Sequence, residues 1–333
     1  MALPKIVTII VNYKLAELIT SHLQSLASEV RQFPNSGIVI IDNASPGDDV
    51  DQLRGFVQKN QLSDCVEIIA NPDNSGFGTG NNIAMRSVLE QAKPTGAGAP
   101  DYFFLLNPDA WVQPGAIKTL TDFLEQTPNA VIAGPRLEGE DGTIQRSNFR
   151  FFTVLGEFEQ TVRTGIFTKI LKSCSVLAPQ GEETVKAQWV SGAAFMMRVN
   201  MLEQSGMFDE DYFLYYEETD LMLQMQRKGL DVYYVPDARV VHLAGQSTGV
   251  VDNTGEDDVP PIFWFESRAH YFRKNCGPIL SFCADLSWLS GSVLYLTRLM
   301  VFGGKKASAE RSALRKTIAM FCKNQFGGGL KKN

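Results

Sequence analysis

The fold is decided by the stretch Asp101-Tyr-Phe-Phe-Leu-Leu-Asn-Pro-Asp109-Ala110. Residues 102–106 form a short apolar run between Pro100 and Pro108, which is typical of a strand buried on both faces of a parallel sheet. Ligands of an open α/β sheet bind at the carboxyl ends of its strands. Asp109 is therefore placed where its carboxylate could bind a divalent cation that bridges substrate phosphates. The alternative is that Asp109 only begins a turn before a helix.

Three earlier apolar runs end in polar groups of the same kind. Residues 5–11 end at Asn12-Tyr13, residues 37–41 end at Asp42-Asn43-Ala44-Ser45, and residues 66–70 lead into Asn71-Pro-Asp-Asn-Ser-Gly76-Phe-Gly78-Thr-Gly80-Asn81-Asn82 before a helix at 83. Such groups could hold a nucleotide base, a ribose and a phosphate, or they could be ordinary turn and capping residues. No glycine-rich loop follows the first run, which counts against a dinucleotide-binding oxidoreductase.

The second half of the chain carries three more candidate sites. Trp189 and Gly192 lie among small residues, where a sugar ring could stack on the indole, unless Trp189 is a core residue. Glu217 and Glu218 follow an aromatic run and begin a helix, so they cap it or supply a general base with a raised pKa. His242, one of three histidines, is either a core residue or a metal ligand.

The net charge of −6 divides into +8 for residues 298–333, which hold nine Lys and Arg against Glu310, and −14 for the rest. This asymmetry disfavours a nucleic-acid-binding protein and suits a soluble catalytic domain held to an anionic membrane by its end. The chain runs from Met-Ala-Leu-Pro-Lys straight into a strand, so neither a signal peptide nor an N-terminal anchor is expected. Five cysteines without a C-x-x-C pair indicate a reducing cytosol.

Two further segments carry none of these motifs. Residues 135–188 give no clear assignment beyond a hairpin turn at 138–142, and the rest could line an acceptor site. Residues 279–302 are apolar apart from Asp285 and Arg298, and this run is too interrupted for a bilayer crossing of about 20 apolar residues. With the basic amphipathic residues 307–323, they predict a helix pair lying on the membrane surface, and a helical cap or a homodimer contact is the alternative.

Taken in order, these segments resemble family 2 inverting glycosyltransferases with the GT-A fold, in the bacterial rhamnosyltransferase-like branch. The resemblance covers residues 5–275. It rests on Val11-Asn12-Tyr13, Asp42-Asn43-Ala44-Ser45, Asn74-Ser75-Gly76-Phe77, Gly80-Asn81-Asn82, Leu106-Asn107-Pro108-Asp109, Trp189-Val190-Ser191-Gly192-Ala193, Phe208-Asp209-Glu210, Tyr216-Glu217-Glu218-Thr219-Asp220-Leu221 and His242-Leu-Ala-Gly245-Gln-Ser247. It implies an α/β fold with a Rossmann-like mixed sheet flanked by helices, a catalytic domain over 1–275 and a C-terminal helical appendage over 276–333.

The resemblance also implies roles for single residues. The donor would be held by Val11, Asn12, Tyr13, Asp42, Asn43, Asn74, Gly76, Phe77, Asn81, Asn82, Asn107, Trp189 and Gly192. Asp109 matches the last residue of the family's D-x-D motif and would bind Mg²⁺ or Mn²⁺, with Asn107 in place of the first acid and His242 completing the metal site. The general base would be Glu218, and Glu217 is a second candidate.

The implied activity is a metal-dependent, inverting sugar transfer, with rhamnose from dTDP-rhamnose as the expected donor. The acceptor would be a polysaccharide or a polyprenyl-diphosphate-linked glycan at the cytoplasmic face of the cell membrane. A UDP-hexose or galactofuranose donor and a non-catalytic sugar-nucleotide-binding module are the alternatives. No cysteine or serine lies in a setting typical of a nucleophile, which agrees with a single displacement that needs one base and one cation.

Overall fold

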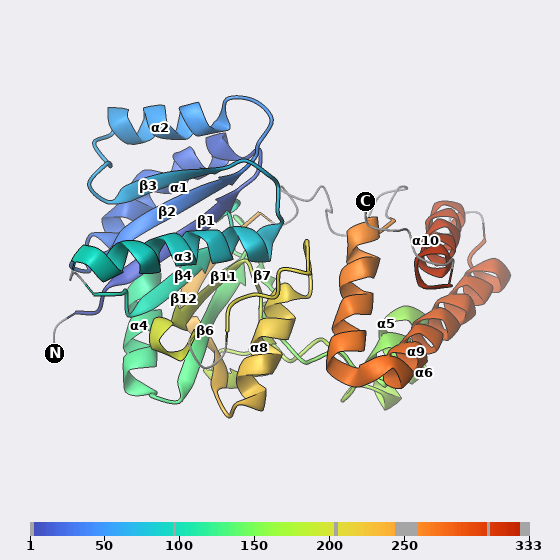
Figure 1. The fold of residues 1–333 in the computed structure, drawn as a ribbon. Coiled ribbons are helices and arrows are strands. Elements are labelled where there is room, and N and C mark those ends of the chain that lie inside the picture. Colours follow the sequence, from blue (N-terminus) through green and yellow to red (C-terminus); the bar gives the residue numbers. More distant parts are fainter. Residues whose placement is uncertain (1–2, 96–97, 203–205, 244–258, 305–306, 327–333) are drawn as a thin grey trace. The chain divides into compact units, whose positions relative to one another are not determined.

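The computed structural model describes residues 3–95, 98–202, 206–243, 259–304 and 307–326 (Figure 1). The chain divides into two compact units. Unit 1 comprises Met1–Phe149, Pro179–Phe213 and Glu217–Gly249, and unit 2 comprises Arg150–Ala178, Leu214–Tyr216 and Val250–Asn333. The domain boundary expected between residues 275 and 276 stays a prediction.

Unit 1 is built on a mixed sheet with the order β3-β2-β1-β4-β11-β6-β12-β5, and β7 and β9 pair with β6 and β12. Its strands are β1 (Ile6–Asn12), β2 (Gly37–Asn43), β3 (Val66–Asn71), β4 (Tyr102–Leu106), β5 (Ala110–Val112), β6 (Ala130–Glu138), β7 (Ile144–Gln145), β9 (Val185–Ala187), β11 (Ala194–Arg198) and β12 (Asp231–His242). The short strands β8 (Asn148–Phe149) and β10 (Trp189–Val190) pair separately. The mixed sheet confirms the fold class predicted from the sequence.

Strand β4 lies at the centre of this sheet, as its apolar run predicts. It pairs in parallel with β1 and antiparallel with β11, and all five of its residues are buried. Strands β1, β2 and β3 continue the parallel half on one side. Because parallel strands end at the same edge, the polar residues that follow them are brought to one edge of the sheet.

Helices surround the sheet of unit 1 (Figure 1). They are α1 (Ala16–Val30), α2 (Asp49–Lys59), α3 (Phe77–Thr95), α4 (Ala116–Gln126), the short 3₁₀ helix η1 (Val199–Met201) and α8 (Glu217–Arg227). In α4, Ile117, Leu120 and Leu124 are buried at helical spacing, so this face packs on the sheet. The segment Glu138 to Gln145 forms the predicted hairpin between β6 and β7.

Helix α3 begins at Phe77, six positions before the predicted start at residue 83. The Gly80 N–H donates to the Gly76 carbonyl at 3.1 Å, which closes the first turn. A Cβ on Gly80 would lie 3.0 Å from Val11, so glycine lets the helix approach β1 closely. Gly78, Gly80, Asn81 and Asn82, which the sequence reading placed before the helix, therefore lie inside it, whereas Asn71, Asn74 and Gly76 precede it.

Unit 2 is helical. It contains α5 (Val154–Val162), α6 (Gly165–Ile170), α9 (Ile262–Phe302) and α10 (Ser308–Phe326). Gly277 interrupts α9 with φ 80° and ψ 170°, and Pro278 follows it. Phe265, Trp288 and Phe321 form an aromatic core between α9 and α10. Helices α5 and α6 lie within residues 135–188, for which no clear assignment follows from the sequence alone.

Candidate active site

Two neighbouring strand ends bring together residues predicted to hold the nucleoside. Asn12 and Asp42 are register partners at the ends of β1 and β2, and both are buried. The Asn12 amide donates to Asp42 Oδ1 at 2.7 Å and to Asp49 Oδ1 at 3.0 Å. The Ser45 N–H donates to Asp42 Oδ2 at 3.0 Å. The Asn12 amide thus has partners inside the protein, while Tyr13 beside it is only half-buried.

The segment between β3 and α3 is held by asparagine side chains. The Asn43 amide donates to the Gly76 carbonyl at 2.8 Å, and the Gly76 N–H donates to Asn74 Oδ1 at 3.2 Å. Gly76 has φ +85°, and a Cβ there would overlap the carbonyl oxygen of Phe213. That carbonyl accepts from the Phe77 N–H at 3.1 Å. Position 76 therefore requires glycine for both its conformation and its surroundings.

Asn81 and Asn82 also contact protein groups. The Asn81 amide donates to the Phe77 carbonyl at 3.0 Å, within α3. The Asn82 amide donates to the Phe208 carbonyl and to Glu210 Oε1, both at 2.9 Å, and Asn82 Oδ1 accepts from the Phe208 N–H at 3.1 Å. Asn82 thus anchors residues 208–210 to α3. The donor-binding roles expected for both asparagines stay predictions.

Other residues expected at the donor site lie in packed surroundings. Trp189 is 8% exposed and stacks on Phe149, with 4.2 Å between the ring centroids and 14° between the planes. Val11 is buried under α3. The Asn107 N–H donates to the Ala193 carbonyl at 2.8 Å, which ties the end of β4 to the start of β11. The Trp189 ring is therefore already stacked within the protein, and its role toward a sugar stays a prediction.

The pairing of β5 with β12 places Asp109 beside His242, as the metal-site prediction requires. His242 is the register partner of Ala110, and the Leu243 N–H donates to the Asp109 carbonyl at 3.0 Å. Asp109 Oδ1 lies 3.4 Å from His242 Nε2. Asp109 is 1% exposed, and no group in the described part of the chain donates a hydrogen bond to this Oδ1. A buried carboxylate oxygen without a donor is costly, so the site suits a ligand that neutralises it.

Gln145 in β7 orients the His242 ring. Gln145 Nε2 donates to the His242 carbonyl at 2.7 Å, and its Oε1 lies 3.2 Å from His242 Nδ1. Since an amide oxygen only accepts, His242 Nδ1–H donates to Gln145 Oε1, and Nε2 is the ring nitrogen that faces Asp109. Asp109 Oδ1 and His242 Nε2 thus face each other as two atoms that can both bind one cation.

These residues fit a divalent metal ion. A carboxylate oxygen and an imidazole nitrogen are common metal ligands, and a ligating histidine characteristically donates its other N–H to a neighbouring acceptor. Sequence reasoning identified Asp109 and His242 but missed Gln145, because nothing near residue 145 marks a ligand site. Gly245 and Ser247, which belong to the motif after His242, lie outside the described residues.

Glu217 and Glu218 begin helix α8, but their surroundings differ. Glu217 is 3% exposed, and a Cβ on Gly78 would lie 3.5 Å from its Cβ. Glu218 is half-buried, and a Cβ on Gly192 would lie 3.3 Å from its Oε1. Within the described ranges, no group donates to the Oε2 atom of either acid. Gly192, expected at the donor site, is thus the close neighbour of the predicted base.

Burial raises the pKa of both carboxyls above the ordinary glutamate value. The charge of Glu218 raises the pKa of Glu217 further, whereas backbone N–H groups of Glu218, Thr219 and Gly192 oppose the rise in the pKa of Glu218. Ionisation of one of these adjacent acids therefore disfavours ionisation of the other. The more exposed acid, Glu218, is the better placed to accept a proton from a substrate.

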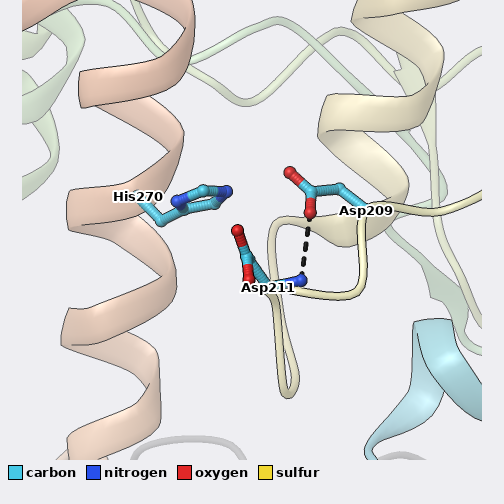
Figure 2. Close-up of side chains that lie close together, drawn as sticks. All are labelled: Asp209, Asp211 and His270. Atoms are coloured by element: carbon cyan, nitrogen blue, oxygen red, sulfur yellow. Dashed lines mark hydrogen bonds between the residues drawn. The ribbon is translucent and has the colours of Figure 1, made fainter. Parts of the chain in front are cut away.

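A turn at residues 209–211 follows the segment that Asn82 anchors. The Asp211 N–H donates to Asp209 Oδ1 at 3.0 Å (Figure 2). Asp209 belongs to unit 1, as does Asp211, whereas His270, drawn in the same figure, belongs to unit 2. The turn shapes the backbone before α8 and was identified in sequence only through Asp209 and Glu210.

Several curated proteins are similar to this chain. The N-acetylglucosaminyl-diphospho-decaprenol L-rhamnosyltransferase of Mycobacterium tuberculosis is 27% identical over 259 residues, covering 75% of this chain and 79% of the relative. Rhamnosyltransferase WbbL of Escherichia coli is 31% identical over 170 residues, covering 51% and 61%. The dTDP-rhamnosyl transferase RfbF of Shigella flexneri is 25% identical over 264 residues, covering 78% of each chain. These relatives confirm the resemblance to the rhamnosyltransferase branch.

Solved structures show the same fold. A mannosyltransferase from Pyrobaculum calidifontis, solved with GDP-Man and Mn²⁺, has a TM-score of 0.57 at 13% identity and covers 99% of this chain and 89% of its own. GalNAc-T7, solved with UDP, GalNAc and Mn²⁺, has a TM-score of 0.56 at 14% identity and covers 95% and 55%. The model of the family described as Glycosyl transferase family 2 matches residues 6–203. The chain therefore belongs to glycosyl transferase family 2 and is a glycosyltransferase.

Proposed function

We propose that this glycosyltransferase moves rhamnose from dTDP-rhamnose, with inversion and with a divalent metal ion, onto a polysaccharide or lipid-linked glycan. The observation that carries the metal dependence is the approach of Asp109 Oδ1, to which no described group donates, to His242 Nε2 at 3.4 Å. The donor and acceptor rest on the relatives, one named for dTDP-rhamnose and one for a decaprenol-linked acceptor.

In the proposed reaction Glu218 acts as the general base. It takes the proton of the acceptor hydroxyl as that oxygen forms a bond to the anomeric carbon of the donor. The bond between the anomeric carbon and the diphosphate oxygen breaks, and its electron pair leaves with the nucleoside diphosphate. Glu217, which is buried next to Glu218 in the chain, keeps the local charge low because its own raised pKa favours the protonated form.

Asp109 and His242 would hold Mg²⁺ or Mn²⁺, and when bound such an ion neutralises charge on the departing diphosphate. Gln145 keeps the His242 ring turned toward Asp109. Asn12, Asp42 and Tyr13 would border the nucleoside at the ends of β1 and β2. The protein would work at the cytoplasmic face of the cell membrane, where lipid-linked acceptors are available.

The test is a binding panel of dTDP-rhamnose, UDP-galactose, UDP-galactofuranose and dTDP, measured by calorimetry with Mn²⁺ or with chelator. The proposal expects dTDP-rhamnose to bind most tightly, and only with metal. Transfer to a synthetic N-acetylglucosaminyl-diphospho-lipid is then followed by mass spectrometry, and proton NMR of the product reports the anomeric configuration. Tighter binding of a UDP-sugar would overturn the donor assignment, and equal binding with chelator would overturn the metal assignment.

A further inference from the structure

The second part of helix α9, residues 279–302, exposes apolar side chains and buries polar ones. Its large exposed apolar residues are Ile279, Leu280, Phe282, Leu286, Val293, Leu294, Met300, Val301 and Phe302. Their exposed fractions reach 78% at Ile279 and 82% at Phe302. The buried residues of the same part are Ser281, Ala284, Asp285, Trp288, Gly291, Ser292 and Leu299. A helix at the surface of a water-soluble protein usually shows the opposite arrangement.

The buried side of this helix is used within unit 2, which explains its polar residues. Asp285 Oδ1 accepts from the fully buried Arg268 at 2.7 Å, and Arg268 also pairs with Glu157 at 2.6 Å. A Cβ on Gly291 would overlap the Thr161 side chain, so glycine allows α5 to lie directly against α9. Ion pairs turned inward and small residues at helix contacts are characteristic of helices that face lipid.

Helix α6 extends the exposed apolar surface. None of its residues is buried, and Ile166 and Ile170 are each 70% exposed. Arg163, just before α6, lies over the Tyr295 ring at 5.5 Å, and its carbonyl accepts from Arg298 at 2.8 Å. These contacts hold the start of α6 against the last turns of α9. We refer to residues 279–302 together with α6 as the apolar face.

Cationic residues accompany the apolar face. Exposed lysines stand at 169 and 172, in and just after α6, and Arg298 is exposed on α9. Helix α10 packs on α9 through Ala313, Thr317 and Phe321, which leaves Arg315 and Lys316 exposed. Residues 298–333 carry nine Lys and Arg against one acid. Apolar side chains beside basic ones fit the headgroup region of an anionic bilayer.

We propose that the apolar face docks on a bilayer rich in anionic lipid, with α9 lying along the surface. Charge argues against a second copy of the chain, because two such faces would bring like charges together. Helix α9 is long and apolar enough to cross a membrane by length and composition alone. However, helix α5 packs along α9 and would have to enter the bilayer with it. The 9 residues of α5 span only about 14 Å, whereas the hydrocarbon layer is roughly 30 Å thick, so α5 is too short to cross. All residues of the apolar face belong to unit 2, whereas the residues expected to bind the sugar donor belong to unit 1.

The test measures co-flotation of the full-length protein with vesicles, without any sugar nucleotide. Vesicles are pure phosphatidylcholine or equal parts phosphatidylcholine and phosphatidylglycerol. A face variant carries Leu286→Gln, Leu294→Gln and Val301→Gln. A matched control carries Leu3→Gln, Val185→Gln and Ile262→Gln, which change exposed apolar residues outside the face. Circular dichroism checks that both variants keep the wild-type melting temperature.

The expected result is binding of wild type and control to anionic vesicles, about tenfold weaker binding to neutral vesicles, and about tenfold weaker binding of the face variant. Equal binding of face variant and wild type would overturn the proposal. A second outcome would also overturn it: no form of the protein binds vesicles, and light scattering finds a dimer for the wild type but not for the face variant. A second copy of the chain would then cover the face. Resistance of the cellular protein to alkaline extraction would show a spanning helix and would also overturn it.

Discussion

Both units bury acidic side chains, but three acids of the candidate site in unit 1 differ from the paired acids Glu157 and Asp285 of unit 2. In unit 2, Glu157 and Asp285 each accept a short bond from Arg268, so the charges are paired. In unit 1, Asp109, Glu217 and Glu218 keep carboxylate oxygens to which no described group donates. A paired buried acid supports the fold, whereas an unpaired one costs stability and persists where a ligand or a proton is to be bound. The presence or absence of a hydrogen-bond donor therefore distinguishes acids that stabilise the fold, Glu157 and Asp285, from acids expected to act on a ligand, Asp109, Glu217 and Glu218.

The largest expected effect is on the transfer reaction. Glu218→Gln keeps the shape of the side chain but cannot accept the acceptor's proton, so the transfer rate should fall about 10³-fold. Donor affinity, measured by calorimetry, should change less than twofold, because Glu218 is not expected to contact the nucleotide. Glu217→Gln is the matched variant and should lose much less activity. A normal rate for Glu218→Gln would remove the assignment of the base, and an inactive Glu217→Gln with an active Glu218→Gln would exchange the two roles.

The next largest effect is on stability, and it tests whether the paired acid Asp285 of unit 2 stabilises the fold while the unpaired acid Asp109 of unit 1 does not. Asp285→Ala should lower the free energy of unfolding by about 3 kcal/mol, because it leaves part of the buried Arg268 charge without a partner. Asp109→Asn should leave stability equal or higher, since the asparagine removes an unpaired buried charge. Urea denaturation followed by circular dichroism measures both. If Asp109→Asn costs as much as Asp285→Ala, the Asp109 carboxylate supports the fold and the distinction fails.

The sequence predicted the sheet better than the details of its edge. Continuous apolar runs such as residues 102–106 are diagnostic because only a central strand buries both faces. The predicted start of α3 at residue 83 is wrong because glycine and asparagine have low helix propensity. Packing of residues 77–82 on β1 stabilises a helix there in spite of that propensity. Gln145 was missed because it meets His242 across 97 positions through strand pairing. The sequence also could not predict which side of α9 is exposed, since hydropathy does not tell which face of an apolar helix other elements cover.

A smaller effect is expected at the residue that the sequence did not identify. Gln145→Leu removes the acceptor for His242 Nδ1–H, so the ring can turn or change tautomer, and Mn²⁺ affinity should fall about tenfold. Gln145→Glu keeps an acceptor oxygen and should retain most of the affinity. Because the chain has three histidines, ¹⁵N NMR of labelled protein resolves the His242 tautomer without any turnover. An unchanged Nδ1–H signal and unchanged Mn²⁺ affinity in Gln145→Leu would show that Gln145 does not orient the ring.

The smallest effect concerns pH. The folded pKa of Glu217 lies above the unfolded value because of burial and the neighbouring charge of Glu218. Between those two values the folded protein binds more protons, so this group stabilises the fold below the unfolded pKa and loses that contribution as pH rises through the folded pKa. Glu217→Gln removes this titrating carboxyl. The free energy of unfolding should therefore decline less with pH above pH 5 in the variant than in the wild type, by on the order of 1 kcal/mol. If the decline above pH 5 is unchanged in Glu217→Gln, then Glu217 does not hold its proton more tightly in the folded protein than in the unfolded one, and the proton-binding role given to this unit 1 acid is wrong.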